Sequence, residues 1–357
     1  MLANLFSPPS RASTLSQLGG RTRQSRLTPA PVTGILTAAP LPPATNTPLL
    51  AGGPLSGVLK KDRERAAFYA NPERHAAMTQ PLPEYLRDDI ARNVAFALEE
   101  DIREGDITAQ LIDDDSASEA TIITRESAVM CGSAWADEVF RQLGDVHIQW
   151  HVTDGDRLTP DTTLCTLNGN TRQILTGERT ALNFLQTLMG TATAARRYAD
   201  AVAGTRVTIL DTRKTLPGLR AAQKYAVLCG GCDNHRIGLY DAFLIKENHV
   251  TACGGITAAI ERARALSPDK KIIVEVETLE ELQEAAELKP DQIMLDNFSA
   301  DMLAQAAQMA TTSALEVSGN LTVENAKALP AGRDWFLSSG ALTKHVQAVD
   351  LSLRLQP

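Results

Sequence analysis

Long hydrophobic runs are absent from this sequence, and so is any concentration of cysteine. No apolar stretch in the 357 residues approaches the roughly 18 residues that a membrane-spanning helix needs, so we expect no membrane association. The cysteines are scattered with no secretory segment before them, which favours reduced thiols in a cytosolic compartment. We therefore expect a cytoplasmic protein with five free cysteines, which are Cys131, Cys165, Cys229, Cys232 and Cys253.

Positively charged residues are also fewer than negatively charged ones over the chain as a whole, 35 against 43. The net charge is −8, which argues against nonspecific binding of nucleic acid, so any anion site must be built from a local group of cations. The 43% hydrophobic content is ordinary for a globular protein. The length suggests two domains.

Acidic residues are missing from the first 60 residues, which are rich in Pro, Ser, Thr, Ala and Gly. Such a composition cannot bury enough apolar surface to offset the entropy lost on ordering, so we expect residues 1–80 to be a disordered extension. An organelle transit peptide is one alternative, although prolines interrupt every apolar run. Another alternative is that translation starts at Met78.

Residues 81–182 mix helical and strand patterns without regular alternation, which indicates an α+β domain. Apolar residues at helical spacing predict a helix from Glu84 to Asp101. Strands are predicted at 120–130, 146–152 and 163–167, with Ser133 as the N-cap of a short helix after the first of them. The tail at 346–357 alternates Val or Leu with polar residues, so we expect it to return to this domain as an edge strand.

Residues 183–345 show a regular alternation of strands and helices. Six strands are predicted, near 206–210, 242–246, 271–276, 291–295, 314–318 and 334–338, and this alternation favours parallel strands with covering helices. Polar residues end every strand. One rim that collects groups from all strands is typical of an α/β barrel rather than an open sheet.

The stretch from Asp211 to Val250 carries most of the predicted chemistry. Two short apolar strands run directly into charged residues, and ligands bind at the C-terminal ends of parallel strands. Arginine forks suit carboxylates, whereas lysines are compact charges for phosphate oxygens. The stretch therefore predicts a site for a small polyanion, built from Arg213, Lys214, His235, Arg236 and Lys246.

Two carboxylates end neighbouring strands of the predicted barrel. Glu275 and Asp296 would face each other across the rim, and paired oxygen ligands of this kind suit Mg²⁺. Glu277 lies on the same strand face as Glu275 and is a candidate third participant. The simpler alternative is that either carboxylate only neutralises a nearby lysine.

Glycine-bearing loops follow the last two strands, as Ser318-Gly319-Asn320 and Ser339-Gly340-Ala341. Backbone N–H groups in such loops can cradle anions, and late-strand loops are the usual phosphate site of a barrel. Ordinary turns are the alternative. The pair Cys229 and Cys232 has metal-like spacing but no second such pair, so we interpret both as packing residues in a turn.

The segments DTRKTLPGLR, NHR and LIKENH, with ERTALNFLQ, EVE, MLDN, VSGN and SSGALT, resemble the quinolinate phosphoribosyltransferase family. The resemblance extends from about residue 84 to the C-terminus. It implies an incomplete α/β barrel beside an open α+β sandwich domain. It also implies phosphoribosyl transfer from 5-phosphoribosyl 1-pyrophosphate to quinolinate with decarboxylation, using Mg²⁺ at Glu275 and Asp296. The family tends to have glycine in the Cys229–Cys232 turn, so this chain departs from it there.

The same resemblance assigns residue roles. It implies that the catalytic residues are Lys214, Lys246, Glu275 and Asp296. The other implied substrate-binding residues are Thr212, Arg213, His235, Arg236, Ser318, Gly319, Asn320, Ser339 and Gly340. Arg179 by itself looks like a helix-surface residue paired with Glu178, but it matches an arginine that enters the partner's active site, which implies an obligate homodimer. The alternatives are a paralogous phosphoribosyltransferase for another base and a non-catalytic sugar-phosphate-binding protein.

Overall fold

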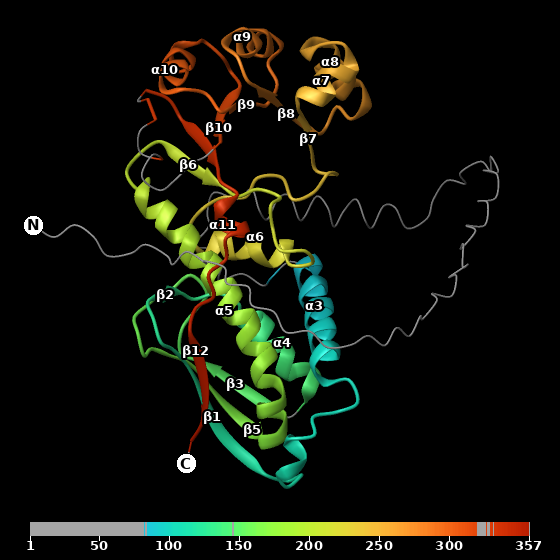
Figure 1. Ribbon diagram of the computed structural model, residues 1–357, viewed down its shortest axis with the longest axis vertical. Helices are drawn as coiled ribbons and strands as arrows, with labels where there is room; N and C mark the ends of the chain where they lie inside the picture. The colour runs from blue at the N-terminus through green and yellow to red at the C-terminus, as the bar shows by residue number, and fades with distance from the viewer. Residues whose placement is uncertain are drawn as a thin grey trace, which may run out of the picture. The chain divides into compact units, whose positions relative to one another are not determined.

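The computed structural model describes residues 82 and 84–356, except 145, 320–325, 327–328 and 331 (Figure 1). The expectations for residues 1–80 and for Met78 lie outside these described residues, and so does Asn320. Over the described part of the chain, none of the helices combines the length and the apolar character that crossing a bilayer requires.

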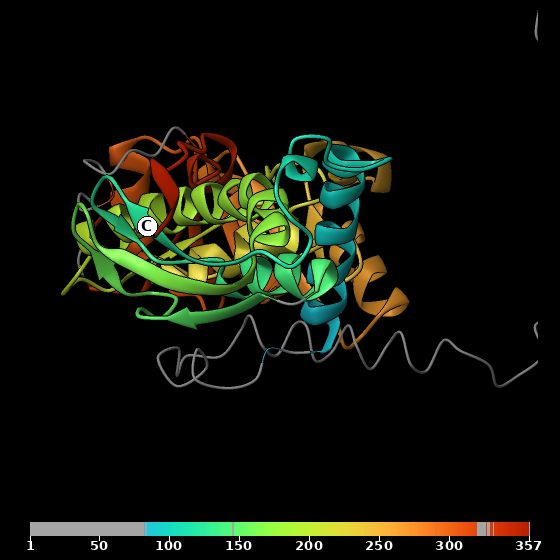
Figure 2. The same ribbon diagram turned by 90° about the horizontal axis from the view of Figure 1, so that it is seen from below.

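A four-stranded antiparallel sheet forms the base of the N-terminal part. Its strands lie in the order β12-β1-β5-β3, and they are β1 (Ala117–Thr124), β3 (Val146–Trp150), β5 (Thr163–Asn170) and β12 (Leu351–Leu355). The C-terminal tail thus returns as an edge strand beside β1. The sheet shares one hydrophobic core with α3 (Glu84–Ile102), α4 (Ser133–Leu143) and α5 (Thr171–Ala201), and Figure 2 shows α5 running alongside the strands.

Two local predictions in this part are wrong. The strand predicted at 120–130 is interrupted after Thr124, whose hydroxyl donates to the carbonyl of Glu126 and turns the chain, and a separate strand β2 (Ala128–Val129) then pairs with β4 (Arg157–Leu158). Ser133 is the first helical residue of α4 rather than its cap. The cap is Gly132, at φ 107°, and the carboxylate of Asp154 accepts the N–H groups of Gly132 and Ser133 at 3.1 and 3.3 Å.

Six parallel strands form the second sheet, and all six correspond to strands predicted from the sequence. They lie in the order β6-β11-β10-β9-β8-β7, so β6 and β7 are edges and the barrel is incomplete. The strands are β6 (Val207–Leu210), β7 (Ala242–Ile245), β8 (Lys271–Val276), β9 (Gln292–Asp296), β10 (Ala314–Ser318) and β11 (Trp335–Ser338). The predicted fold class, an incomplete α/β barrel with an α+β domain, is therefore confirmed.

Successive residues of these strands face opposite sides of the sheet. On β8, Ile272, Val274 and Val276 pack on the outer side in a core shared with the covering helices, whereas Ile273 packs in a small inner cluster with Met294. Figure 1 shows the covering helices α8 (Ile256–Leu266), α9 (Leu279–Leu288) and α10 (Ala300–Gln308) outside the strands. Glu275 shares the inner face with Ile273, and this alternation directs polar side chains into the barrel interior.

The segment between α6 (Arg220–Cys229) and β7 fills the gap between the two edge strands. Asp233 pairs with the end of β6, because its N–H donates to Ile209 at 2.8 Å and its carbonyl accepts from Asp211 at 3.0 Å. Three residues later, the guanidinium of Arg236 donates to the carbonyl of Ala242 in β7 at 3.1 Å. Arg236, one of the predicted anion-binding residues, therefore lies in a segment that forms part of the barrel wall.

Helix α5 connects the two sheets without a linker, because it continues unbroken through residues 182 and 183. The C-terminal tail crosses this helix on its way to β12, where the N–H of Val349 donates to the carbonyl of Gln186 at 3.1 Å. A Cβ atom at Gly190 would lie 2.1 Å from the carbonyl oxygen of Gln347. Only glycine permits this approach of the tail to the helix.

Candidate active site

A fully buried ion pair lies behind the predicted cations. Asp211 follows β6, Lys224 lies in α6, and both side chains are 0% exposed. Asp211 also accepts hydrogen bonds from the backbone N–H of His235 (2.9 Å) and the amide of Asn234 (2.6 Å), while the ammonium of Lys224 donates to the carbonyl of His235 (3.0 Å). Burial raises the pKa of Asp211 and lowers the pKa of Lys224, and each charge partly offsets the shift of the other. The pair thereby fixes the backbone of residues 234–235 against β6.

Two arginines occupy the gap-filling side of the rim. Burial lowers the pKa of Arg236 and the nearby charge of Arg213 lowers it further, with Asp241 offsetting part of the shift. The Nε atom of Arg213 is buried without an acceptor among the described residues. Like charges that are only partly compensated, here by Asp241, are costly, so this pair favours a ligand that carries negative charge.

Lys246 and Glu275 form an ion pair at the ends of β7 and β8. The ammonium lies 2.8 and 2.5 Å from the two carboxylate oxygens, and the Glu275 side chain is only 8% exposed. Glu275 therefore neutralises a lysine in this structure, which is the alternative to metal binding that the sequence left open. Burial raises the pKa of Glu275, and Lys246 lowers it. The like charge of Asp296 raises the pKa of Glu275 again, so the two predicted metal ligands lie close enough to interact.

Glu277 behaves differently from its neighbour. It follows the end of β8 and is exposed, and its backbone N–H donates to the carboxylate of Glu281 in α9 at 2.8 Å. No contact joins it to Glu275 or Asp296 in the described part of the chain. The structure therefore groups Glu275 with Asp296 and leaves Glu277 outside.

The loop after β10 packs against the loop after β9. The N–H of Asn297 donates to the carbonyl of Ser318 at 3.1 Å. Gly319 has φ 125°, and a Cβ atom there would lie 2.8 Å from Oδ1 of Asn297. Both the positive φ and the close approach of Asn297 require glycine at this position. This contact places Ser318 and Gly319 beside Asp296.

The loop after β11 packs against the loop after β6. A Cβ atom at Gly340 would lie 2.9 Å from Cδ of Lys214 and 3.4 Å from the hydroxyl of Thr212. The N–H of Ser339 donates to the carbonyl of Leu210 at 2.9 Å, and the hydroxyl of Thr212 accepts from the N–H of Lys214 at 3.0 Å. A second glycine-bearing loop thus adjoins a lysine of the rim.

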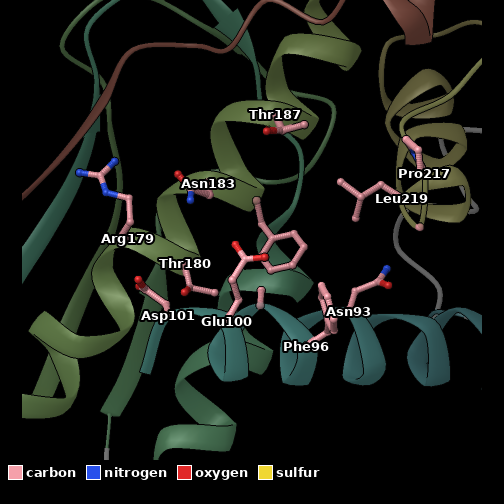
Figure 3. A pocket seen from close by; sticks show the side chains of 13 residues that line it. Asn93, Phe96, Glu100, Asp101, Arg179, Thr180, Asn183, Thr187, Pro217 and Leu219 are labelled. Carbon is pink, nitrogen blue, oxygen red and sulfur yellow. The ribbon is translucent and has the colours of Figure 1, made fainter. Parts of the chain in front are cut away.

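Arg179 lies apart from the cations just described. It lines a pocket of about 490 Å³ between α3 and α5, together with Phe96 and Leu219, and Figure 3 shows its guanidinium pointing away from these two side chains. Among the described residues it has no hydrogen bond or ion pair, and no contact with Arg213, Arg236 or Lys246. Its charge acts on Glu178, whose pKa is raised by burial and lowered by Arg179, but the two make no direct ion pair.

A second polar cluster lies in the N-terminal core, where ligand atoms of Cys131, Asp154 and Cys229 lie within 4.8 Å of one another. Asp154 is already occupied, because it accepts the capping N–H groups of α4 and the hydroxyl of Tyr225 at 3.0 Å. Burial raises the pKa of both thiols, which opposes thiolate formation. Cys232 is buried and its thiol donates to the carbonyl of Ala195. Packing accounts for these cysteines.

Comparison with known proteins identifies the family. Models of the N-terminal and C-terminal domains of quinolinate phosphoribosyl transferase match residues 106–189 and 191–354. The chain belongs to the quinolinate phosphoribosyltransferase family. The match covers both the antiparallel sheet and the incomplete barrel.

Individual members of the family are similar over most of their length. A nicotinate-nucleotide pyrophosphorylase [carboxylating] of Mycobacterium leprae is 42% identical over 279 residues, which are 75% of this chain and 96% of that protein. A probable enzyme of the same name from Bacillus subtilis is 39% identical, over 71% of this chain and 89% of that protein. The solved nicotinate-nucleotide pyrophosphorylase of Francisella tularensis superposes with a TM-score of 0.74 at 45% identity, covering 78% of this chain and 98% of that one.

Two buried charged residues beside the family motifs escape prediction from the sequence. Lys224 stands among Ala222, Tyr225 and Ala226 on a buried helix face, and Glu316 stands between Leu315 and Val317 inside β10. A charge within an apolar segment is the signal in both cases. The sequence alone does not reveal which residues pair with them.

We expect Lys224→Met to destabilise the protein by about 3–5 kcal/mol, because it leaves the carboxylate of Asp211 buried and uncompensated. The measurement is the free energy of unfolding from urea denaturation. Lys270→Met, in the turn before β8, is the control and should lie within about 0.5 kcal/mol of wild type. The double variant Lys224→Met/Asp211→Asn should recover part of the loss. A Lys224→Met protein as stable as the control would contradict this account.

Proposed function

We propose that this protein transfers the phosphoribosyl group of 5-phosphoribosyl 1-pyrophosphate to quinolinate with decarboxylation. The products are nicotinate mononucleotide, pyrophosphate and CO₂, and the reaction belongs to NAD biosynthesis. The observation that carries the proposal is two neighbouring arginines, Arg213 and Arg236, at the rim of a barrel of this family; within the described part of the chain neither makes an ion pair with a carboxylate, although the charge of Asp241 acts on Arg236.

Quinolinate offers two neighbouring carboxylates on a pyridine ring, and each guanidinium can bind one carboxylate through two parallel N–H···O bonds. Such bonds are stronger in a partly buried site than in water, because less solvent competes for the charges. Since nicotinate has only one carboxylate, it would leave one of the two arginines uncompensated. The arginine pair therefore favours the dicarboxylate over the monocarboxylate.

The phosphate-bearing substrate would lie on the other side of the rim. Lys214, Ser318, Gly319, Ser339 and Gly340 come from the loops that pack against one another there, and Lys246 lies at the end of β7. Loop N–H groups and compact ammonium charges suit phosphate oxygens, although the N–H of Ser339 already donates to the carbonyl of Leu210. We assign these residues to the 5-phosphate and pyrophosphate groups.

Glu275 and Asp296 would hold Mg²⁺. The fit rests on the two carboxylates themselves, which interact as like charges close to the rim and supply the oxygen ligands that Mg²⁺ prefers. When bound, the ion would neutralise negative charge on the departing pyrophosphate. Lys246, already paired with Glu275, contributes a second positive charge at the same place.

The chemistry needs no side-chain nucleophile. The pyridine nitrogen attacks the anomeric carbon of the ribose as the bond to pyrophosphate breaks, and the ring becomes cationic. The adjacent carbon–carboxylate bond then breaks, CO₂ leaves, its electron pair stays on the ring carbon beside the cationic nitrogen, and a proton takes its place. The protein's part is to orient both substrates and to stabilise the charge that develops on the leaving group.

We also propose a homodimer in which Arg179 reaches the active site of the partner. The support is that Arg179 has no anionic partner within its own chain, among the described residues, although it is close to a pocket and to the exposed side chain of Phe96 (69% exposed). A cytoplasmic location is proposed from the free thiols.

Purified protein given quinolinate, 5-phosphoribosyl 1-pyrophosphate and Mg²⁺ should form nicotinate mononucleotide and release CO₂. A parallel reaction with nicotinate in place of quinolinate should give no product, because one arginine would remain uncompensated, and a metal chelator should stop the first reaction. Chromatography of the products and trapping of CO₂ are the measurements. Product from nicotinate alone would show that the arginine pair was misassigned, and no product from either acid would contradict the proposed function.

Arg179→Ala and Arg213→Ala should each be inactive alone but should recover activity when mixed, because a mixed dimer holds one site with both arginines intact. With random exchange in a one-to-one mixture, the expected recovery is about a quarter of wild-type activity. Exchange is verified with two differently tagged subunits. The matched control is Arg197→Ala, an exposed arginine on the same helix, which should retain activity. Proven exchange without recovery would exclude a shared site.

A further inference from the structure

Two fully buried polar side chains support the loop that follows β6, residues 211–219, which carries Lys214. Gln223 lies on α6, and Thr343 lies on α11 (Ala341–Lys344), the short helix after β11. Both residues are 0% exposed, so neither side chain can contact a substrate. Burying a polar side chain is costly unless its hydrogen bonds are made, and both of these side chains bond to the backbone.

The two side chains hold the peptide groups on either side of Thr215. The hydroxyl of Thr343 donates to the carbonyl of Lys214 at 2.7 Å, and the side-chain oxygen of Gln223 accepts from the N–H of Leu216 at 2.7 Å. The amide nitrogen of Gln223 also donates to the backbone carbonyl of Thr343 at 2.9 Å. These three hydrogen bonds join the loop, α6 and α11 in a closed ring, which we call the Gln223–Thr343 ring.

The amide of Gln223 has one orientation that satisfies its surroundings. Its oxygen faces an N–H, which can only donate, and its nitrogen faces a carbonyl, which can only accept, so a rotated amide would lose both hydrogen bonds. The same nitrogen donates to the hydroxyl of Thr191 on α5 at 3.2 Å. The Gln223–Thr343 ring is therefore anchored to the helix that connects the two sheets.

The ring adjoins the glycine against which Lys214 packs. A Cβ atom at Gly340 would lie 2.9 Å from Cδ of Lys214, so the stem of the lysine passes close to this glycine. The N–H of Thr343 donates to the carbonyl of Gly340 at 3.3 Å. Thr343 thus holds the backbone of Lys214 and the backbone of Gly340 at once, which fixes the lysine relative to the loop after β11.

We propose that Gln223 and Thr343 are positioning residues that hold Lys214 against the Gly340 loop for the phosphate groups of 5-phosphoribosyl 1-pyrophosphate. The inference rests on the proposed function, which assigns Lys214 and Gly340 to phosphate oxygens. An ammonium on a flexible stem is a precise phosphate ligand only if its backbone is fixed. Arg213 precedes both of the held peptide groups, so the ring should affect phosphate binding more than quinolinate binding.

The first test is steady-state kinetics of Thr343→Val and Thr343→Ser. Valine has the shape of threonine without the hydroxyl, so Thr343→Val should raise the KM for 5-phosphoribosyl 1-pyrophosphate about tenfold, the scale of one lost buried hydrogen bond. The KM for quinolinate should change by less than about twofold, and Thr343→Ser, which keeps the hydroxyl, should have both constants close to wild type. A purely structural role would lower the amount of active enzyme and hence kcat, and would leave both KM values unchanged.

The matched control is Thr312→Val, at an exposed position just before β10, which should have wild-type constants. An unchanged KM for 5-phosphoribosyl 1-pyrophosphate in Thr343→Val would overturn the proposal, and so would an equal loss in Thr343→Ser. Wild type without activity on quinolinate would instead contradict the proposed function itself.

A double-variant comparison tests whether the ring acts as one unit. Gln223→Met removes two of the three hydrogen bonds and keeps a side chain of similar length, so it should raise the same KM about as much as Thr343→Val does. Gln223→Met/Thr343→Val should lie within about threefold of the worse single variant, because either change alone opens the ring. Losses that multiply would overturn the proposal.

Hydrogen exchange tests the geometry without turnover. In the wild type the N–H of Leu216 should exchange more slowly than a solvent-exposed loop amide, and both Gln223→Met and Thr343→Val should accelerate its exchange by about tenfold. The measurement is mass spectrometry of overlapping peptides that isolate residue 216. Fast exchange at Leu216 in the wild type would overturn the proposal even if neither variant folds.

Discussion

The buried ion pair of Asp211 and Lys224 joins the end of the first barrel strand, β6, to helix α6. Asp211 follows β6, Lys224 lies on α6, and together they hold the backbone at Asn234 and His235. Because both charges are fully buried, each depends on the other, and separating them would leave an uncompensated charge in the interior. The segment that fills the gap in the barrel is therefore fixed by electrostatics as well as by its pairing with β6.

With Arg213 and Arg236 as the proposed dicarboxylate site, this constraint explains how a protein of net charge −8 would bind such a ligand. The barrel places cations from separated segments on one rim, and the buried pair prevents the segment that carries Arg236 from moving away from Arg213. The two arginines are held close although their charges repel. The charge of Arg213 lowers the pKa of Arg236, so an anionic ligand placed between them would offset this repulsion.

Much of this arrangement follows from local sequence patterns. The six barrel strands are predictable because each is a short apolar run that ends in a polar residue, and β12 is predictable because its apolar residues alternate. Ser133 is mistaken for a cap because the capping carboxylate, Asp154, comes from another part of the chain. Lys224 and Glu316 are missed for the same reason, since their partners are set by the fold. The proposed role of Arg179 comes from the family resemblance, and its support in the structure is only that Arg179 makes no ion pair among the described residues.

The most direct test of the central claim is calorimetric titration of the wild-type protein with quinolinate and, separately, with nicotinate. The two acids differ by one carboxylate, so the comparison isolates the second arginine's contribution. A charge-assisted hydrogen bond contributes about 1.5–3 kcal/mol, so we predict that quinolinate binds at least about tenfold more tightly. Equal affinities for the two acids would contradict the claim that Arg213 and Arg236 form a site for a dicarboxylate.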